Sequence, residues 1–276
     1  MVVSLVESAN TTQPIGVFDS GLGGLTVLSA IHEKLPSENL IYFGDTARVP
    51  YGSKSRDTVI RYSEEILEFL ITKGVKTVVV ACNTASSYAI DLLREKNQLP
   101  ILGVVEPGIQ ALVKQNPNIS QAAVIATRST VKSGTYQSKA KKIKSDLSLY
   151  AKACPLLVPL IEEGMAEKKA AELIIREYLD EIVRENIEHV ILGCTHYPII
   201  KETIKRVYPD LNLIDSSLEV ASSLELLLEE KNLKNKETTE GKISIYVSDI
   251  TESLADMEKL FFGNTIYSME KVMLGW

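Results

Sequence analysis

The stretch VVVACNTAS at residues 78–86 decides the fold, because its β-branched apolar run ends at Cys82. A second stretch, VILGCTHYP at residues 190–198, has the same construction and places Cys194 at the equivalent point. Each run is long enough for one buried parallel strand, and a helical pattern follows each of them. Open α/β sheets bind ligands at the carboxyl ends of their strands. Both cysteines are therefore predicted to lie at ligand-binding edges.

Outward from residues 78–86, short apolar runs alternate with helical patterns, which predicts βαβ units and a parallel sheet. The expected strands in this half are 15–18, 40–43, 76–81 and 101–105, and the expected helices are 25–35, 56–73 and 84–97.

The same alternation restarts after Pro107. Asp19 precedes Cys82 by nearly the same separation as Thr127 precedes Cys194, which predicts a duplicated α/β domain whose two copies face one another across a cleft. The strands expected here are 122–126, 148–153, 157–160, one ending at Cys194, and 212–214, with helices at 108–115, 131–145 and 167–185. The charged residues 229–242 predict a loop, followed by a strand at 243–248, a helix near 252–262 and a short final strand.

Composition limits the function classes. The 276 residues carry a formal charge of -6 and show no basic stripe, so we expect no nucleic-acid partner. The three cysteines are odd in number and lack CxxC spacing, which predicts a reducing, cytoplasmic compartment and no zinc site. No apolar run is long enough for a membrane span, so we expect no membrane association. Residues 1–14 make a poor signal peptide and are expected to form a short mobile extension.

Two thiols in matching positions indicate proton transfer at carbon. The thiolate is the active form of cysteine, and a helix N-terminus favours it. Two bases on opposite faces of one tetrahedral carbon remove a proton from one side and return one from the other. Asp19 and His196 are candidate proton-carrying neighbours of Cys82 and Cys194. Cys154, between Ala and Pro, is interpreted as an inert buried cysteine.

The glycine turn at residues 21–24 also suggests a dinucleotide-binding site. Asp45 follows the turn at about the sequence separation of the acidic residue that binds the ribose in such sites. The pattern fails in detail because the third glycine position of G-x-G-x-x-G falls on Thr26. Asp19 would in addition point a carboxylate towards a pyrophosphate.

Four motifs in order resemble the glutamate racemases of the Asp/Glu racemase family: DSGLGG at 19–24, Asp45 with PYG at 50–52, CNT at 82–84 and GCTH at 193–196. The resemblance runs from about residue 15 to residue 215. It implies a racemase that needs no cofactor, interconverts L- and D-glutamate, and supplies D-glutamate for bacterial peptidoglycan.

The resemblance also implies roles for individual residues. Cys82 and Cys194 would be the two proton donors and acceptors, assisted by Asp19 and His196 respectively. The implied substrate-binding residues are Asp19, Ser20, Tyr51, Gly52, Asn83, Thr84, Thr195 and His196, with Asp45, Thr127, Thr130 and Glu162 as a second tier.

The fold implied by the resemblance has two similar, pseudo-symmetric α/β domains with the active site between them. The first domain comprises residues 15–106 and 216–276, the second comprises 107–215, and a homodimer is usual. Three alternatives stay open: an aspartate or other amino-acid racemase, a cysteine hydrolase that uses one nucleophile, and an amino-acid-binding module without activity.

Overall fold

The computed structural model describes residues 11–250 and 267–274. Its first sheet is parallel throughout, with the strand order β10-β9-β2-β1-β3-β4. The strands are β1 (Ile15–Asp19), β2 (Leu40–Gly44), β3 (Thr77–Val80), β4 (Ile101–Gly103), β9 (Ile243–Val247) and β10 (Tyr267–Lys271).

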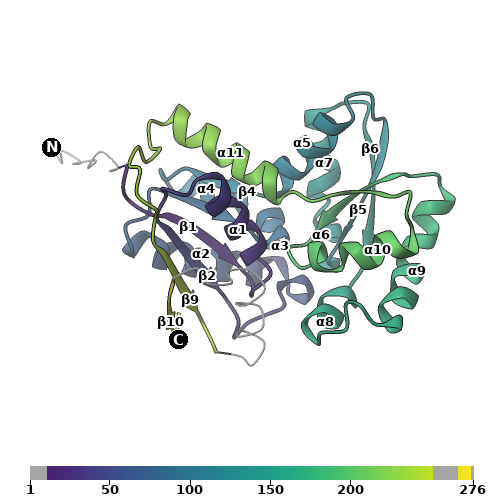
Figure 1. Cartoon of the computed structure of the whole chain (residues 1–276), viewed down its shortest axis with the longest axis horizontal. Coiled ribbons are helices and arrows are strands. Elements are labelled where there is room, and N and C mark those ends of the chain that lie inside the picture. Colours follow the sequence, from purple (N-terminus) through teal and green to yellow (C-terminus); the bar gives the residue numbers. More distant parts are fainter. Residues whose placement is uncertain (1–10, 251–266, 275–276) are drawn as a thin grey trace.

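A second parallel sheet lies beside the first (Figure 1) and has the strand order β6-β5-β7-β8. Its strands are β5 (Gln121–Ala126), β6 (Ser148–Ala153), β7 (His189–Gly193) and β8 (Asn212–Ile214). The order β2-β1-β3-β4 in the first sheet matches β6-β5-β7-β8 in the second, strand for strand. The prediction of two similar α/β domains is confirmed.

Helices cover both faces of the first sheet because its strand side chains alternate between the faces. Val17, Tyr42 and Val79 belong to one apolar cluster, which also contains residues of α1 and α11. Phe18 and Val80 belong to another, which contains residues of α2, α3 and α4. The bounds are α1 (Leu25–Lys34), η1 (Tyr51–Ser53), α2 (Arg56–Thr72), α3 (Asn83–Tyr88), α4 (Ile90–Lys96) and α11 (Ser217–Glu230).

The second sheet is covered in the same way. Ala123 and Leu192 pack in a cluster with residues of α8, α9 and α10, and Val124 packs in another with residues of α5 and α7. The bounds are α5 (Val105–Gln115), α6 (Arg128–Ser133), α7 (Thr135–Ile143), α8 (Leu157–Glu162), α9 (Lys169–Arg184), η2 (Tyr197–Ile200) and α10 (Lys201–Val207). Within residues 11–250 and 267–274, none of the helices is both long and apolar enough to cross a bilayer.

One expected strand is wrong. Residues 157–160 form the start of the helix α8. Pro159 lacks the N–H that a central strand needs, whereas the first turn of a helix leaves its N–H groups unpaired in any case. The apolar run at residues 157–160 was too short for its hydrophobic periodicity to distinguish a strand from a helix.

Other elements differ in their bounds. The expected helix at 84–97 is divided at Ala89 into α3 and α4, and that at 131–145 is divided at Gly134, which is left-handed. The helices α10 and α11 were not predicted. The helix expected near 252–262 lies outside the described residues.

The expected domain boundaries stay a prediction. The boundary at 106/107 falls within the first turn of α5, whereas that at 215/216 precedes α11. α11 packs against both α1 and α5 and so contacts the helices of both sheets. Within the expected extension 1–14, the carbonyls of Thr12 and Pro14 accept hydrogen bonds from Asn39 and from the Lys76 backbone.

Candidate active site

The candidate site lies at the carboxyl ends of both sheets. In the first sheet β1 lies between β2 and β3, so the chain changes direction across the sheet at β1, and ligands bind outside such a point. Asp19 ends β1, and Cys82 follows β3. In the second sheet Thr127 follows β5 and Cys194 follows β7, which are the equivalent positions.

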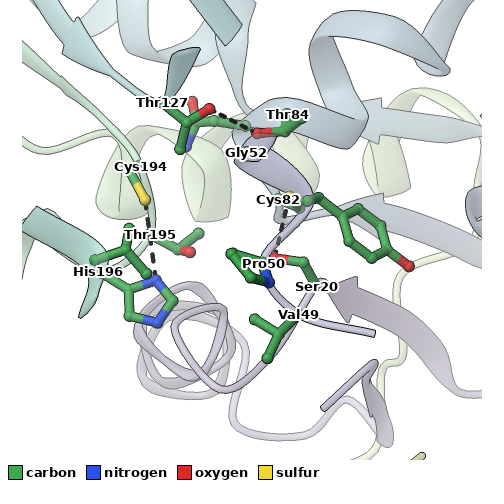
Figure 2. A pocket seen from close by; sticks show the side chains of 13 residues that line it. Ser20, Val49, Pro50, Gly52, Cys82, Thr84, Thr127, Cys194, Thr195 and His196 are labelled. Atoms are coloured by element: carbon green, nitrogen blue, oxygen red, sulfur yellow. Dashed lines mark hydrogen bonds between the residues drawn. The ribbon is translucent and has the colours of Figure 1, made fainter. Parts of the chain in front are cut away.

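Both of these cysteines line one cavity, with a volume of about 20 Å³. Figure 2 shows Cys82 beside Ser20 on one side and Cys194 beside His196 on the other. A space of this size holds about one water molecule. The lining residues are Ser20, Val49, Pro50, Tyr51, Gly52, Cys82, Asn83, Thr84, Thr127, Val158, Cys194, Thr195 and His196.

Cys82 is a buried thiol at the start of α3. Its sulfur lies 3.6 Å from Ser20 Oγ and accepts a bond from the Ala85 N–H. Burial, followed by the nearby Asp19 carboxylate, raises the pKa of Cys82 to about 12. The Ala85 N–H at the start of α3 lowers the pKa of Cys82, in the direction expected of a helix N-terminus, but burial outweighs it. The neutral thiol is the resting form.

Cys194 has a different neighbour. Its sulfur lies 3.9 Å from His196 Nδ1, and His196 Nε2 lies 3.1 Å from Glu162 Oε1. Burial lowers the pKa of His196, but the contacts with Cys194, Glu162 and Asp19 outweigh burial and raise it to about 10. His196 is therefore an imidazolium at neutral pH and places a positive charge 3.9 Å from the Cys194 sulfur. The residue after Cys194 does not begin a helix, since η2 starts at Tyr197.

Asp19 is fully buried and stands behind the cavity wall. It accepts hydrogen bonds from the N–H groups of Gly21 and Gly24, and Thr195 Oγ1 donates to it at 3.4 Å. Burial raises the pKa of Asp19, against the opposing effect of His196. This carboxyl thus joins the end of β1 to the Cys194 segment of the other sheet.

Three threonine hydroxyls join the two domains on another side of the cavity. Thr84 Oγ1 lies 3.0 Å from that of Thr127 and 3.1 Å from that of Thr130, and the latter two are 2.9 Å apart. Thr84 and Thr127 line the cavity, whereas Thr130 supports them from behind. Their hydroxyls are hydrogen-bond donors and acceptors suited to a polar ligand.

Asp45 does not reach the cavity. Its carboxylate accepts hydrogen bonds from Tyr51, Arg48 and Ser248, and so fixes the Tyr51 ring in the cavity wall. The Arg48 guanidinium lies 4.0 Å from the Tyr62 ring centroid and also bonds Glu65. Sequence reasoning did not select Arg48, although it stands between the Asp45 and PYG motifs.

Four other residues were missed. Val49, Pro50 and Val158 supply apolar wall, and Tyr136 donates a 2.7 Å bond to Asn83 Oδ1. Pro50 was visible within the PYG motif. Val158 was obscured by the wrong strand at 157–160, and nothing in the sequence pairs Tyr136 with Asn83.

Two glycines allow the domains to approach closely. A Cβ on Gly23 would lie 2.5 Å from His196 Nδ1, and one on Gly52 would lie 2.6 Å from Thr127 Cβ. A larger residue at either position would displace the facing His196 or Thr127 side chain.

The cavity is lined without lysine or arginine. In the part of the chain that the structure describes, no group of three or more His, Cys, Asp or Glu side chains is arranged to hold a metal ion. A carboxylate in the cavity would be held by hydroxyl and N–H groups.

Comparisons with known proteins agree with this arrangement. The family model for Asp/Glu/hydantoin racemase matches residues 15–224. The chain belongs to the Asp/Glu/hydantoin racemase family. It is therefore an enzyme of the isomerase class, an amino-acid racemase.

Individual members of the family match over most of their length. The chain is 48% identical to the glutamate racemase of Persephonella marina, covering 94% of this chain and 97% of that protein. Glutamate racemase of Francisella tularensis, solved in complex with D-glutamate, superposes with a TM-score of 0.88 at 40% identity, covering 95% and 98% of the two chains. The RacE1 glutamate racemase of Bacillus anthracis superposes with a TM-score of 0.90 at 32% identity, covering 95% and 98%.

Proposed function

We propose that this enzyme interconverts L- and D-glutamate, with Cys82 and Cys194 as the two bases that act on Cα. The observation that carries the proposal is that both thiols, each from the end of an equivalent strand in a different domain, line one cavity. Relatives of 39–48% identity named glutamate racemase support the choice of substrate.

The reaction balances with the groups in the cavity. A thiolate on one cysteine takes the Cα proton, and the electron pair of the broken C–H bond stays on the substrate. The thiol of the other cysteine then gives its proton to the opposite face of the same carbon. The stereocentre is inverted, and the two cysteines exchange protonation states. The reverse reaction starts from the state that the forward reaction leaves.

The two thiols are prepared differently for this exchange. Cys82 is held as a neutral proton donor by its burial and by the Asp19 carboxylate. Cys194 lies 3.9 Å from Nδ1 of the protonated His196 ring. Asp19 and His196 are thus proposed to assist Cys82 and Cys194 respectively as these thiols give and take the Cα proton.

The substrate is proposed to be held by polar groups around the thiols. Ser20, Tyr51, Gly52, Asn83, Thr84 and Thr195 line the cavity, and their hydroxyl, amide and N–H groups suit two carboxylates and an ammonium group. Asp45, Thr127, Thr130 and Glu162 are proposed as supports. Because the cavity is far smaller than an amino acid, we propose that the domains separate to admit substrate and close on it.

Proton NMR in D2O with purified protein tests the two-base proposal. We expect α-proton exchange and loss of optical rotation with D-glutamate, and much slower reaction with L-aspartate. Cys82→Ala and Cys194→Ala should each abolish racemisation. Cys154→Ala is the matched control, since Cys154 is equally buried but lies outside the cavity wall. Racemisation at the parent rate by either cavity variant would exclude the mechanism.

We propose further that the D-glutamate formed supplies peptidoglycan synthesis, in the cytoplasm, and that the enzyme is a homodimer. The three free cysteines are consistent with a reducing compartment. Rescue of a bacterium that depends on added D-glutamate tests the biological role, and sedimentation equilibrium tests the dimer.

A further inference from the structure

A second, larger cleft adjoins the reaction cavity. It has a volume of about 800 Å³, and four basic residues, Lys54, Arg56, Arg128 and Lys132, stand in its wall. We refer to it as the cationic cleft. Its single acidic residue is Asp91, which pairs with Lys139 at 3.5 Å.

The four cations have no carboxylate partner among the residues that the structure describes. Arg128 and Lys132 are four residues apart on α6, so they stand on the same side of the helix and repel one another. This excess of positive charge is found on a chain whose formal net charge is -6. A local positive charge that has no carboxylate partners, on a protein that is negatively charged overall, favours binding of an anion.

The cationic cleft and the reaction cavity share a wall. Gly52 lines both of them. On α6 the N-cap Thr127 faces the cavity, and the next residue, Arg128, faces the cleft. Ser129 Oγ donates a 3.0 Å hydrogen bond to the Lys54 carbonyl, which ties α6 of one domain to the segment after η1 of the other. The cleft therefore lies directly outside the part of the cavity wall that Gly52 and Thr127 form.

The two spaces differ in charge and size. The reaction cavity is lined without Lys or Arg and has room for about one water molecule. The cleft has four cations and room for a complete amino acid. The proposed substrate carries two carboxylates and a net negative charge, so it is attracted to the cleft before the closed cavity can accept it.

We propose that the cationic cleft is the route by which the dicarboxylate substrate enters, with Lys54, Arg56, Arg128 and Lys132 concentrating the anion at the mouth of the cavity. The proposal rests on the proposed function, since that function supplies the anionic substrate. Charges of one sign around a cleft raise the arrival rate of an oppositely charged small molecule by about 10- to 1000-fold, and salt removes the effect.

A pair of alkylating reagents measures this attraction without the racemase reaction. Iodoacetate is an anion and iodoacetamide is neutral, and both transfer a carbon to a cysteine sulfur with release of iodide. Peptide mass spectrometry reads alkylation of Cys82 and Cys194 separately. The ratio of the two rate constants at each cysteine reports how strongly the approach favours an anion.

We expect Arg128→Gln with Lys132→Gln to lower the iodoacetate-to-iodoacetamide ratio about fivefold at low salt and to leave the iodoacetamide rate unchanged. At about 0.5 M salt, parent and variant should have the same ratio. Lys141→Gln with Lys142→Gln is the matched control, because it removes the same charge from α7 outside the cleft. Equal ratios in parent and cleft variant, or an equal fall in the control, would overturn the proposal.

A second measurement distinguishes failure of the proposed entry route from failure of the proposed function. Circular dichroism with D-glutamate should give an unchanged kcat for the cleft variant. A parent enzyme that does not racemise glutamate would refute the proposed function and leave the alkylation ratios to decide the route. If the α6 variant does not fold, Lys54→Gln with Arg56→Gln tests the same cleft from the first domain and should give the same fall.

Discussion

His196 is hydrogen-bonded through Nε2 to Glu162 Oε1, at 3.1 Å. The imidazole is buried, whereas the Glu162 side chain is 38% exposed. The other ring nitrogen faces the Cys194 sulfur at 3.9 Å. His196 therefore joins a thiol inside the closed cavity to a carboxylate in contact with solvent, and Cys82 has no equivalent connection within residues 11–250 and 267–274.

Replacing Glu162 with Gln should lower the pKa of His196, because the ring loses a carboxylate acceptor that raises it. Since the pKa of His196 is about 10, lowering it by about one pH unit leaves the imidazolium population near pH 8 almost unchanged and reduces it about tenfold only above pH 10, so we expect the alkaline limb of the racemisation pH profile to move down by about one pH unit. NMR titration of the His196 ring gives the pKa, and a polarimetric pH profile gives the rate. Glu163→Gln is the control, since its carboxylate makes no bond to His196. An unchanged His196 pKa would contradict this account.

The stability of the protein should fall as the pH rises from 6.5 to 10. His196 has an ordinary pKa of 6.5 and a folded-state pKa of about 10, so the folded state binds more protons between these values. The stabilisation is complete below pH 6.5 and is lost as the pH passes through 10. Cys82 acts in the same direction between its ordinary 9.0 and about 12. Urea unfolding at pH 6, 8 and 9.5 measures the effect, and a His196→Gln protein with the same slope as the parent would refute it.

Gly23→Ala should reduce racemisation about 100-fold, because a Cβ there lies 2.5 Å from His196 Nδ1 and displaces that ring. The fold should persist, since the conflict lies between the domains. Gly108→Ala in α5 is a matched control: its Cβ meets Ser216 Cβ at 3.4 Å, an ordinary contact. Steady-state rates and thermal melting separate the two effects. Parent activity in Gly23→Ala would show that the domains need not approach this closely during turnover.

Lys76→Ala should destabilise the protein by about 3–5 kcal/mol, because the buried Glu38 carboxylate loses its cation and keeps only the hydrogen bond from the Asn235 N–H. The Lys76 and Glu38 side chains are 0% and 2% exposed. Lys96→Ala removes an exposed ion pair with Glu64 and should cost less than about 1 kcal/mol. Urea unfolding gives both values, and equal losses would contradict the difference in burial.

Strand and helix alternation was predictable because each strand is a short apolar run and each long helix has an apolar face. The prediction failed at residues 157–160, where a short run that contains Pro159 had no measurable period, and at α11, although Ser216 and Glu219 have the spacing of a capping box at its start. The candidate site residues stood out because polar side chains directly follow the strands. Val158 and Tyr136 did not stand out, since an apolar wall residue and a buried tyrosine look like ordinary core.

The sequence by itself determined that two equivalent strands end in cysteine, because β-branched runs and their spacing are local properties of the chain. Only the tertiary structure decided that Cys82 and Cys194 share one cavity, and that Cys82 stays a neutral thiol while His196 is charged. Burial and the approach of Asp19 raise the pKa of Cys82, whereas the contacts with Cys194 and Glu162 raise that of His196 against the effect of burial. Both depend on packing between segments far apart in the chain, so no local pattern contains them.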